Sequence, residues 1–145
     1  MPPASVWTFF YGSFIHLDVL KKVGVVPKEV EVATLDGFDI RIRPLANLVP
    51  SNEHRVYGVV ATTTHAELSR LYDYATNTLG GTYLPQAVLT GIGGGKCLPA
   101  LCYIAGDLAE GPAAAEYVDL IIEAAKSHGF PGWYVDRLKR FRPKS

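Results

Sequence analysis

Runs of apolar residues separated by short polar breaks predict six strands along the chain. Each run is rich in aromatic or β-branched residues, the composition that strands favour. In the third run, apolar residues at positions 38, 40 and 42 alternate with charged residues, which is typical of a strand with one solvated face. The predicted strands are residues 6–11, 30–35, 38–43, 55–61, 83–90 and 98–105.

Glycine and polar residues predict how these runs are connected. The dipeptide Asp36-Gly37 separates the second run from the third and is a strong signal for a two-residue hairpin. Residues 45–53, rich in proline, asparagine and serine, predict a loop. Gly58, inside a predicted strand, indicates that another part of the chain approaches closely there.

Helical periodicity predicts four helices between and after the strands. The second is the best defined, because Thr64 and Glu67 have the spacing of a capping box. In that helix the apolar residues at 68, 71, 72 and 75 share one face, which predicts that Ala75 is buried. The predicted helices are residues 18–23, a helix from Thr64 to the segment 77–81, residues 114–127 and residues 133–140.

The order of these elements predicts an α+β fold. Three predicted strands follow one another without a helix between them, whereas a doubly wound fold needs alternating strands and helices. We therefore expect a small mixed β-barrel or sheet of about six strands with flanking helices. No repeat or linker divides the chain, so residues 1–145 are interpreted as a single domain.

The composition narrows the class of protein. Hydrophobic residues make up 48% of the chain and charged residues 19%, which argues against disorder. Fourteen basic and fourteen acidic residues give a net charge of zero, whereas a nucleic-acid binder normally carries a basic excess. The basic cluster at 137–144 is interpreted as a solvated helix end. No apolar stretch reaches the ~20 residues that span a bilayer, so neither nucleic acid nor membrane is an expected partner.

The two cysteines indicate a reducing compartment. Cys97 and Cys102 lie on one predicted strand at an odd spacing, so their side chains point to opposite faces, beyond disulfide reach. No basic segment precedes the apolar run at 6–11, as it would in a signal peptide. We therefore expect a cytoplasmic protein.

Several motifs that could hold a cofactor or a metal do not have the required spacing. The glycine-rich stretch 91–96 has one residue too few for a phosphate-binding loop, and strand rather than helix follows it. The histidines at 16, 54, 65 and 128 show none of the spacings of metal sites. Ser13 lacks the flanking glycines of a nucleophile elbow. The sequence predicts no cofactor and no metal.

The segment Tyr11-Gly12-Ser13 is the strongest candidate for a binding site, because it directly follows a buried strand. A glycine at the end of an inner strand can leave successive backbone N–H groups pointing into a pocket, where they would bind an anion. An ordinary turn between strand and helix is the alternative interpretation.

The order of motifs resembles that of the γ-glutamylcyclotransferase-like family, which includes the AIG2-like proteins. The matching motifs are a strand that ends in Tyr-Gly-Ser, a Val-Tyr-Gly-Val strand at 56–59, a helix, and a Gly-Gly-x-Tyr strand that begins near residue 80. The closing segment 117–138 is similar to the family's terminal helix pair. The resemblance extends over almost the whole chain.

The resemblance implies a mixed barrel with a ligand pocket and a specific chemistry. In the family, backbone amides of the Tyr-Gly-Ser loop hold a γ-glutamyl group, and a helix glutamate removes a proton from its α-amino group. The amine then attacks the γ-carbonyl, which releases an amine and leaves 5-oxoproline. The positions of this chain that match the pocket are Tyr11, Gly12, Ser13, Phe14, Tyr83, Tyr103 and Tyr117.

The chain departs from the family pattern at two positions. Counted without gaps from Gly58, the family's catalytic glutamate falls on Ala75, which cannot accept a proton. Asp73 is predicted on the opposite, solvated face of the same helix. Phe14 stands where glutathione-metabolising members carry asparagine, which indicates a more apolar ligand or a filled pocket.

Two functional hypotheses follow. In the first, the chain binds a small anionic or amide-bearing, γ-glutamyl-like metabolite and is catalytically silent. In the second, it is an active cyclotransferase whose base comes from another segment, for which Asp36, Asp107 and Glu110 are the loop candidates. A purely structural or protein-interaction role is a third hypothesis.

Overall fold

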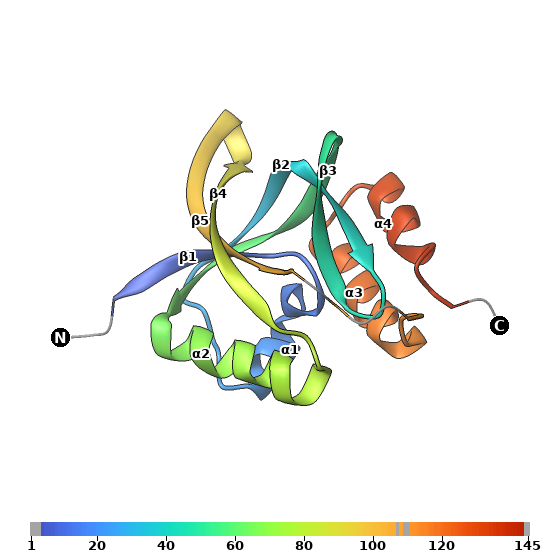
Figure 1. Cartoon of the computed structure of the whole chain (residues 1–145). Helices are drawn as coiled ribbons and strands as arrows, with labels where there is room; N and C mark the ends of the chain where they lie inside the picture. Colours follow the sequence, from blue (N-terminus) through green and yellow to red (C-terminus); the bar gives the residue numbers. More distant parts are fainter. Residues whose placement is uncertain (1–3, 107, 109–110, 144–145) are drawn as a thin grey trace.

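The computed structural model describes residues 4–106, 108 and 111–143, and its centre is a closed β-barrel (Figure 1). Within this part of the chain five strands close the barrel in the order β1-β3-β2-β4-β5. Strand β1 pairs antiparallel with β3 and parallel with β5, so the barrel is mixed. The strands are β1 (Ser5–Phe10), β2 (Val30–Ile42), β3 (Ala46–Thr64), β4 (Tyr83–Ile92) and β5 (Lys96–Ala105). The expected α+β class with a mixed barrel and flanking helices is confirmed.

The predicted hairpin at Asp36-Gly37 is wrong, and this accounts for five strands where six were expected. Strand β2 runs continuously through this dipeptide, and Gly37 adopts φ +88° at an irregularity in the pairing with β3. Asp36 pairs with Arg55 and Phe38 with Pro50, so residues 51–54 of β3 bulge out opposite Gly37 alone. A two-residue hairpin turn would also require a positive φ at Gly37, but here that conformation belongs to a bulge in the pairing of β2 with β3.

The predicted loop at 45–53 is also wrong, because most of it belongs to β3. Residues 46–50 pair with the second half of β2, from Ile42↔Ala46 to Phe38↔Pro50. Pro50 is exposed at the edge of the bulge, and Leu48 is only 3% exposed in the core. Pairing with an alternating partner strand outweighed the local preference of proline and asparagine for turns.

Four α-helices cover the barrel, two below it and two at its right side in Figure 1, within the described residues. They lie close to the predicted ranges. The helices are α1 (Leu17–Lys22), α2 (His65–Tyr74), α3 (Ala115–Ser127) and α4 (Gly132–Lys139). Two short turns matter for the site: the 3-10 helix η1 (Ser13–Ile15) follows β1, and the π-helical turn η2 (Ala75–Leu79) extends α2.

The capping box at the start of α2 is confirmed and fixes the register of this helix. Thr64 Oγ1 accepts from Glu67 N–H at 3.1 Å, and Glu67 Oε1 accepts from Thr64 N–H at 2.9 Å. Leu68 and Leu71 are buried in the core, and Ala75 on the same face is 1% exposed. Because the helix begins at a fixed residue, position 75 is directed at the barrel.

The close approach predicted at Gly58 is also confirmed. A Cβ atom at Gly58 would lie 2.1 Å from the Phe10 carbonyl oxygen and 2.7 Å from the Phe9 ring. This contact brings the end of β1 tightly against β3. The Tyr11-Gly12-Ser13 segment therefore leaves the barrel from a fixed point.

Candidate functional site

A small cavity of about 30 Å³ lies where β1 leaves the barrel and faces the end of α2. That is the space of about two water molecules, or of a carboxylate or carboxamide group. The lining combines aromatic rings with the backbone of the Tyr-Gly-Ser turn. The lining residues are Phe10, Tyr11, Gly12, Ser13, Phe14, Ala46, Tyr72, Ala75, Leu79, Tyr83, Tyr103 and Tyr117. The structure thus brings together every pocket position that the family resemblance implied.

Gly12 is required here for space. A Cβ atom at this position would lie 2.6 Å from the Ala46 Cβ and 3.7 Å from the Tyr117 hydroxyl. The glycine therefore lets β3 pack directly against the turn.

The turn after Gly12 leaves backbone donors at the cavity. In η1 the Gly12 carbonyl accepts from Ile15 N–H and the Ser13 carbonyl accepts from His16 N–H, both at 3.1 Å. Gly12 and Phe14 both line the cavity, and among the described residues their N–H groups donate to no backbone carbonyl outside the regular helices and strands. Such first-turn donors are available to an acceptor on a ligand.

Two tyrosine hydroxyls hold the backbone of Ala46. The Tyr83 hydroxyl donates to the Ala46 carbonyl at 2.5 Å, and Ala46 N–H donates to the Tyr117 hydroxyl at 3.0 Å. On the opposite wall, the Tyr11 hydroxyl donates to the Tyr103 carbonyl at 2.7 Å. The hydroxyl protons of Tyr11 and Tyr83 are thus donated within the protein, whereas the Tyr117 hydroxyl accepts a hydrogen bond.

An aromatic stack that the sequence analysis missed closes one side of the cavity. The rings of Tyr72 and Tyr103 lie 3.8 Å apart and within 10° of parallel. Phe14 meets Tyr72 edge-on with ring centroids 5.6 Å apart, so it occupies part of the pocket without filling it. Tyr72 was assigned only to the buried stripe of α2, and its position one turn before Ala75 was the signal that it also faces the site.

The cavity is an uncharged environment. Burial raises the pKa of Tyr11, Tyr72 and Tyr83, and it also raises that of Tyr103. For Tyr117, burial raises the pKa more than the hydrogen bonds from Ala46 and Ser13 lower it. All five phenols are therefore protonated at neutral pH and act as neutral donors or acceptors.

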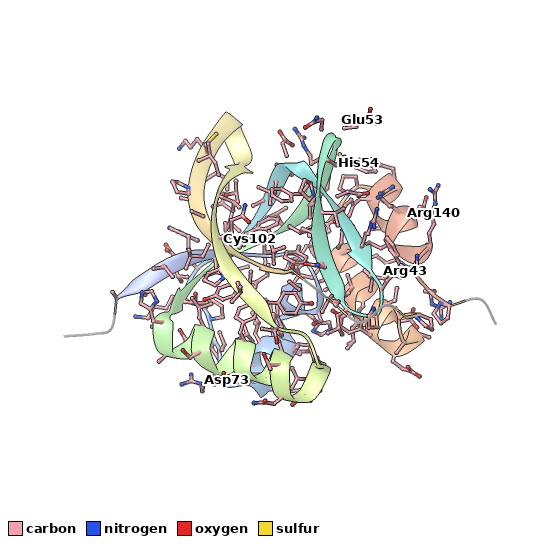
Figure 2. The ribbon with its side chains drawn as sticks, viewed as in Figure 1. Arg43, Glu53, His54, Asp73, Cys102 and Arg140 are labelled. Carbon is pink, nitrogen blue, oxygen red and sulfur yellow. The ribbon has the colours of Figure 1, made fainter. Side chains whose placement is uncertain are left out.

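No carboxylate lines this cavity among the described residues. Ala75 presents a methyl group to it from the end of α2. Asp73 is exposed on the outer side of α2, as Figure 2 shows, and Glu67 is held in the capping box. The helix that faces the pocket supplies no proton acceptor stronger than a phenol or hydroxyl.

The loop carboxylates proposed as alternative bases do not reach the cavity where the structure describes them. Asp36 lies on the exposed side of β2 and pairs with Arg55, with Nε and Oδ1 2.6 Å apart. Asp107 and Glu110 lie outside the described residues.

The remaining sequence motifs are structural in the described part of the chain. Within the stretch 91–96, the turn Gly93–Gly95 joins β4 to β5, with Gly94 and Gly95 at positive φ. The His128 ring lies 2.7 Å from the Ile15 carbonyl, and no group of three or more potential metal ligands gathers anywhere in the described residues.

Cys97 is exposed and Cys102 buried, both as free thiols. None of the described helices combines the length and apolar character needed to cross a membrane.

Comparison with known proteins extends these observations to a family. The family model described as gamma-glutamyl cyclotransferase, AIG2-like, matches residues 8–120, a span that runs from the second half of β1 through the Tyr-Gly-Ser turn and α2 to the first half of α3. The chain belongs to the AIG2-like gamma-glutamyl cyclotransferase family. The expected resemblance is thereby confirmed.

Solved structures share the fold at low sequence identity. A gamma-glutamyl cyclotransferase superposes with a TM-score of 0.82 at 22% identity, over 98% of this chain and 90% of the other. An uncharacterized human protein gives 0.80 at 22% identity, over 97% and 90%. A yeast gamma-glutamyl cyclotransferase specific to glutathione gives 0.65 at 15% identity, over 96% and 97%. At these identities the likeness establishes the fold.

No curated protein sequence matches the chain at a significant level. Function must therefore be argued from the cavity itself.

Proposed function

We propose that this family member binds a small amide- or carboxylate-bearing, γ-glutamyl-like metabolite beside Tyr11-Gly12-Ser13 and does not cyclise it. The observation that carries the proposal is Ala75. It is 1% exposed, it lines the cavity, and the gapless alignment from Gly58 gives it the position of the family's glutamate.

The missing step is the removal of a proton from the ligand's α-ammonium group. That group cannot attack the γ-carbonyl while it is protonated, so cyclisation needs a base within hydrogen-bond reach. A methyl group at position 75 accepts no proton, and the five phenols around it are protonated. This chain would therefore bind the ligand without catalysing the cyclisation.

Binding does not need the base, because the atoms that would contact the ligand are not the atom that would remove its proton. The first-turn N–H groups at Gly12 and Phe14 can donate to a carboxylate or amide oxygen. The Tyr117 hydroxyl also lines the cavity and is a further polar group for such a ligand. A cavity of about 30 Å³ accepts the polar head of such a ligand, and the rest would lie along the partly exposed rings of Tyr72 and Tyr103.

The test measures turnover and binding on the same protein with γ-glutamyl-alanine. We expect no release of 5-oxoproline above the protein-free background, with an active cyclotransferase assayed in parallel, and a rise in melting temperature at millimolar ligand. Turnover of about 1 s⁻¹ or more would overturn catalytic silence. No thermal shift would overturn the binding proposal.

Position 75 also allows the site of binding to be tested. Ala75→Val adds two methyl groups to a cavity of about 30 Å³, so the thermal shift with γ-glutamyl-alanine should disappear. The matched control is Ala66→Val, which makes the same change on the exposed face of α2. Equal loss of the shift in both variants would contradict the assignment of this cavity.

A further inference from the structure

A second, larger cavity of about 620 Å³ lies between α4 and the bulge of β3. It shares no lining residue with the cavity beside Tyr11-Gly12-Ser13. Its volume is in the range of small-molecule sites. We propose that it binds a small planar aromatic acid, with the ring against Trp133 and the carboxylate on Arg140.

One face of α4 forms the first wall. Trp133, Arg137 and Arg140 line the cavity at positions i, i+4 and i+7, so they share one side of the helix and its C-cap. The opposite side of α4 packs Tyr134 and Leu138 into the core, each no more than 1% exposed. The helix is therefore firmly attached, while Trp133 and Arg140 of this stripe are exposed.

Trp133 offers an aromatic surface that is both exposed and held in place. The side chain is 57% exposed, although tryptophan usually buries most of its area. Its ring makes T-shaped contacts with Tyr57 and Tyr134, with centroids 5.8 and 5.7 Å apart. A ring fixed in this way loses little conformational freedom when a planar ligand stacks on it.

The bulge of β3 forms the second wall and is ordered by its own hydrogen bonds. Ser51 Oγ and His54 Nδ1 lie 2.6 Å apart, and Glu53 N–H donates to Ser51 Oγ at 3.3 Å. Figure 2 shows Glu53 and His54 at the tip of this bulge, and Arg140 on the side of the molecule where α4 lies. The four-residue bulge explains why a cavity exists here at all, since regular pairing with β2 would leave no second wall.

Of the charged residues that line this cavity, Arg140 and Glu53 form no ion pair with a described residue. Arg55 pairs with Asp36, and Arg137 pairs with Asp39. A guanidinium binds a carboxylate through two parallel hydrogen bonds.

A single free cation favours a monoanion over a more highly charged ligand. Glu53 and Asp36 also line the cavity and would repel a phosphate dianion more strongly than a carboxylate. The combination of one exposed indole, one free guanidinium and a cavity of this volume therefore selects an aromatic carboxylate.

The experiment compares naphthalene-2-carboxylate with naphthalene-2-carboxamide by isothermal titration calorimetry on the full chain. The two probes have nearly the same shape, and only the first carries a charge. We expect the carboxylate to bind with a Kd below about 1 mM and the carboxamide at least about tenfold more weakly. Equal affinities for the two probes would overturn the proposal.

Two variants assign the contacts. Arg140→Gln should reduce the affinity for the carboxylate to that for the carboxamide and leave the carboxamide unchanged, whereas Trp133→Ala should weaken both. The matched control is Lys139→Gln, which removes a neighbouring exposed charge that does not line the cavity. Wild-type affinity for the carboxylate in Arg140→Gln, or an equal loss in Lys139→Gln, would overturn the assignment.

Discussion

Gly12 is the residue on which the shape of the first cavity depends most directly. A Cβ atom added at this position would lie 2.6 Å from the Cβ atom of Ala46. We predict that Gly12→Ala lowers the free energy of unfolding by about 1–3 kcal/mol, the usual effect of overpacking. Urea denaturation measures this directly.

The control for this substitution is Gly93→Ala, at a glycine of ordinary φ with nothing within 4 Å of an added Cβ atom. It should leave stability nearly unchanged. If Gly12→Ala were as stable as this control, the contact between the turn and β3 would not be as tight as described.

Tyr117 combines a structural role with a binding role. Tyr117→Phe removes the acceptor for Ala46 N–H and leaves a partly buried donor unpaired, which costs about 1–3 kcal/mol. We also predict a smaller thermal shift with γ-glutamyl-alanine, because a hydroxyl group that lines the cavity is lost. The change is measured by urea denaturation and by ligand titration in a thermal-shift assay.

Tyr74→Phe is the matched comparison, since the Tyr74 hydroxyl bonds to no described residue and does not line the cavity. This variant should keep both the stability and the ligand response. A Tyr117→Phe protein that is destabilised but responds fully to the ligand would assign Tyr117 a structural role alone.

At the scale of elements, the start of α2 determines which residue faces the cavity. Thr64→Ala removes one half of the capping box and leaves Glu67 N–H without its partner. We predict a loss of about 0.5–2 kcal/mol in the free energy of unfolding, measured by thermal or urea denaturation. Ser69→Ala, an exposed change within the same helix, should cause no such loss. Equal stability of the two variants would contradict the role of the cap.

The sequence predicted α2 and its buried face well because all of the relevant signals are local. The capping box, the 3.6-residue spacing and the terminating glycines lie within one segment, and the structure has Ala75 buried as expected. The position of the Tyr-Gly-Ser turn could also be predicted from the sequence, because the apolar run of a buried strand directly precedes it.

The β2–β3 region was predicted wrongly because its conformation depends on pairing across the barrel. Asp36-Gly37 is compatible with a hairpin turn or with a bulge, and only the partner strand decides between them. The second cavity could not be foreseen for the same reason: its walls come from a bulge in β3 and from a helix more than seventy residues later.

The whole molecule encloses a large number of weakly acidic groups. Burial raises the pKa of Tyr11, Tyr72 and Tyr83 well above the ordinary value of 10, and raises that of the Cys102 thiol to about 12. Figure 2 shows Cys102 within the barrel. These groups stay protonated in the folded chain at pH values at which the unfolded chain ionises them.

The direction of the resulting pH dependence follows from linkage. Each group has a higher pKa in the folded state than in the unfolded state. Its contribution to the free energy of unfolding is therefore fully present below the pKa of the unfolded state, and it is lost as the pH rises towards the pKa of the folded state. We predict that the free energy of unfolding falls from about pH 8.5, where an exposed thiol ionises, and more steeply above about pH 10, where exposed phenols do. Each group contributes up to about 1.4 kcal/mol per pH unit.

Urea denaturation between pH 7 and pH 10.5 tests this prediction, and the two cysteines separate its parts. Cys102→Ala should flatten the decline between about pH 8.5 and pH 10, where the buried thiol acts alone. Cys97→Ala is the matched control, because this cysteine is exposed. A stability that stays constant up to pH 10.5 would contradict the enclosure of the tyrosines and of Cys102. An equal effect of the two substitutions would show that the thiol inside the barrel is not protected from solvent.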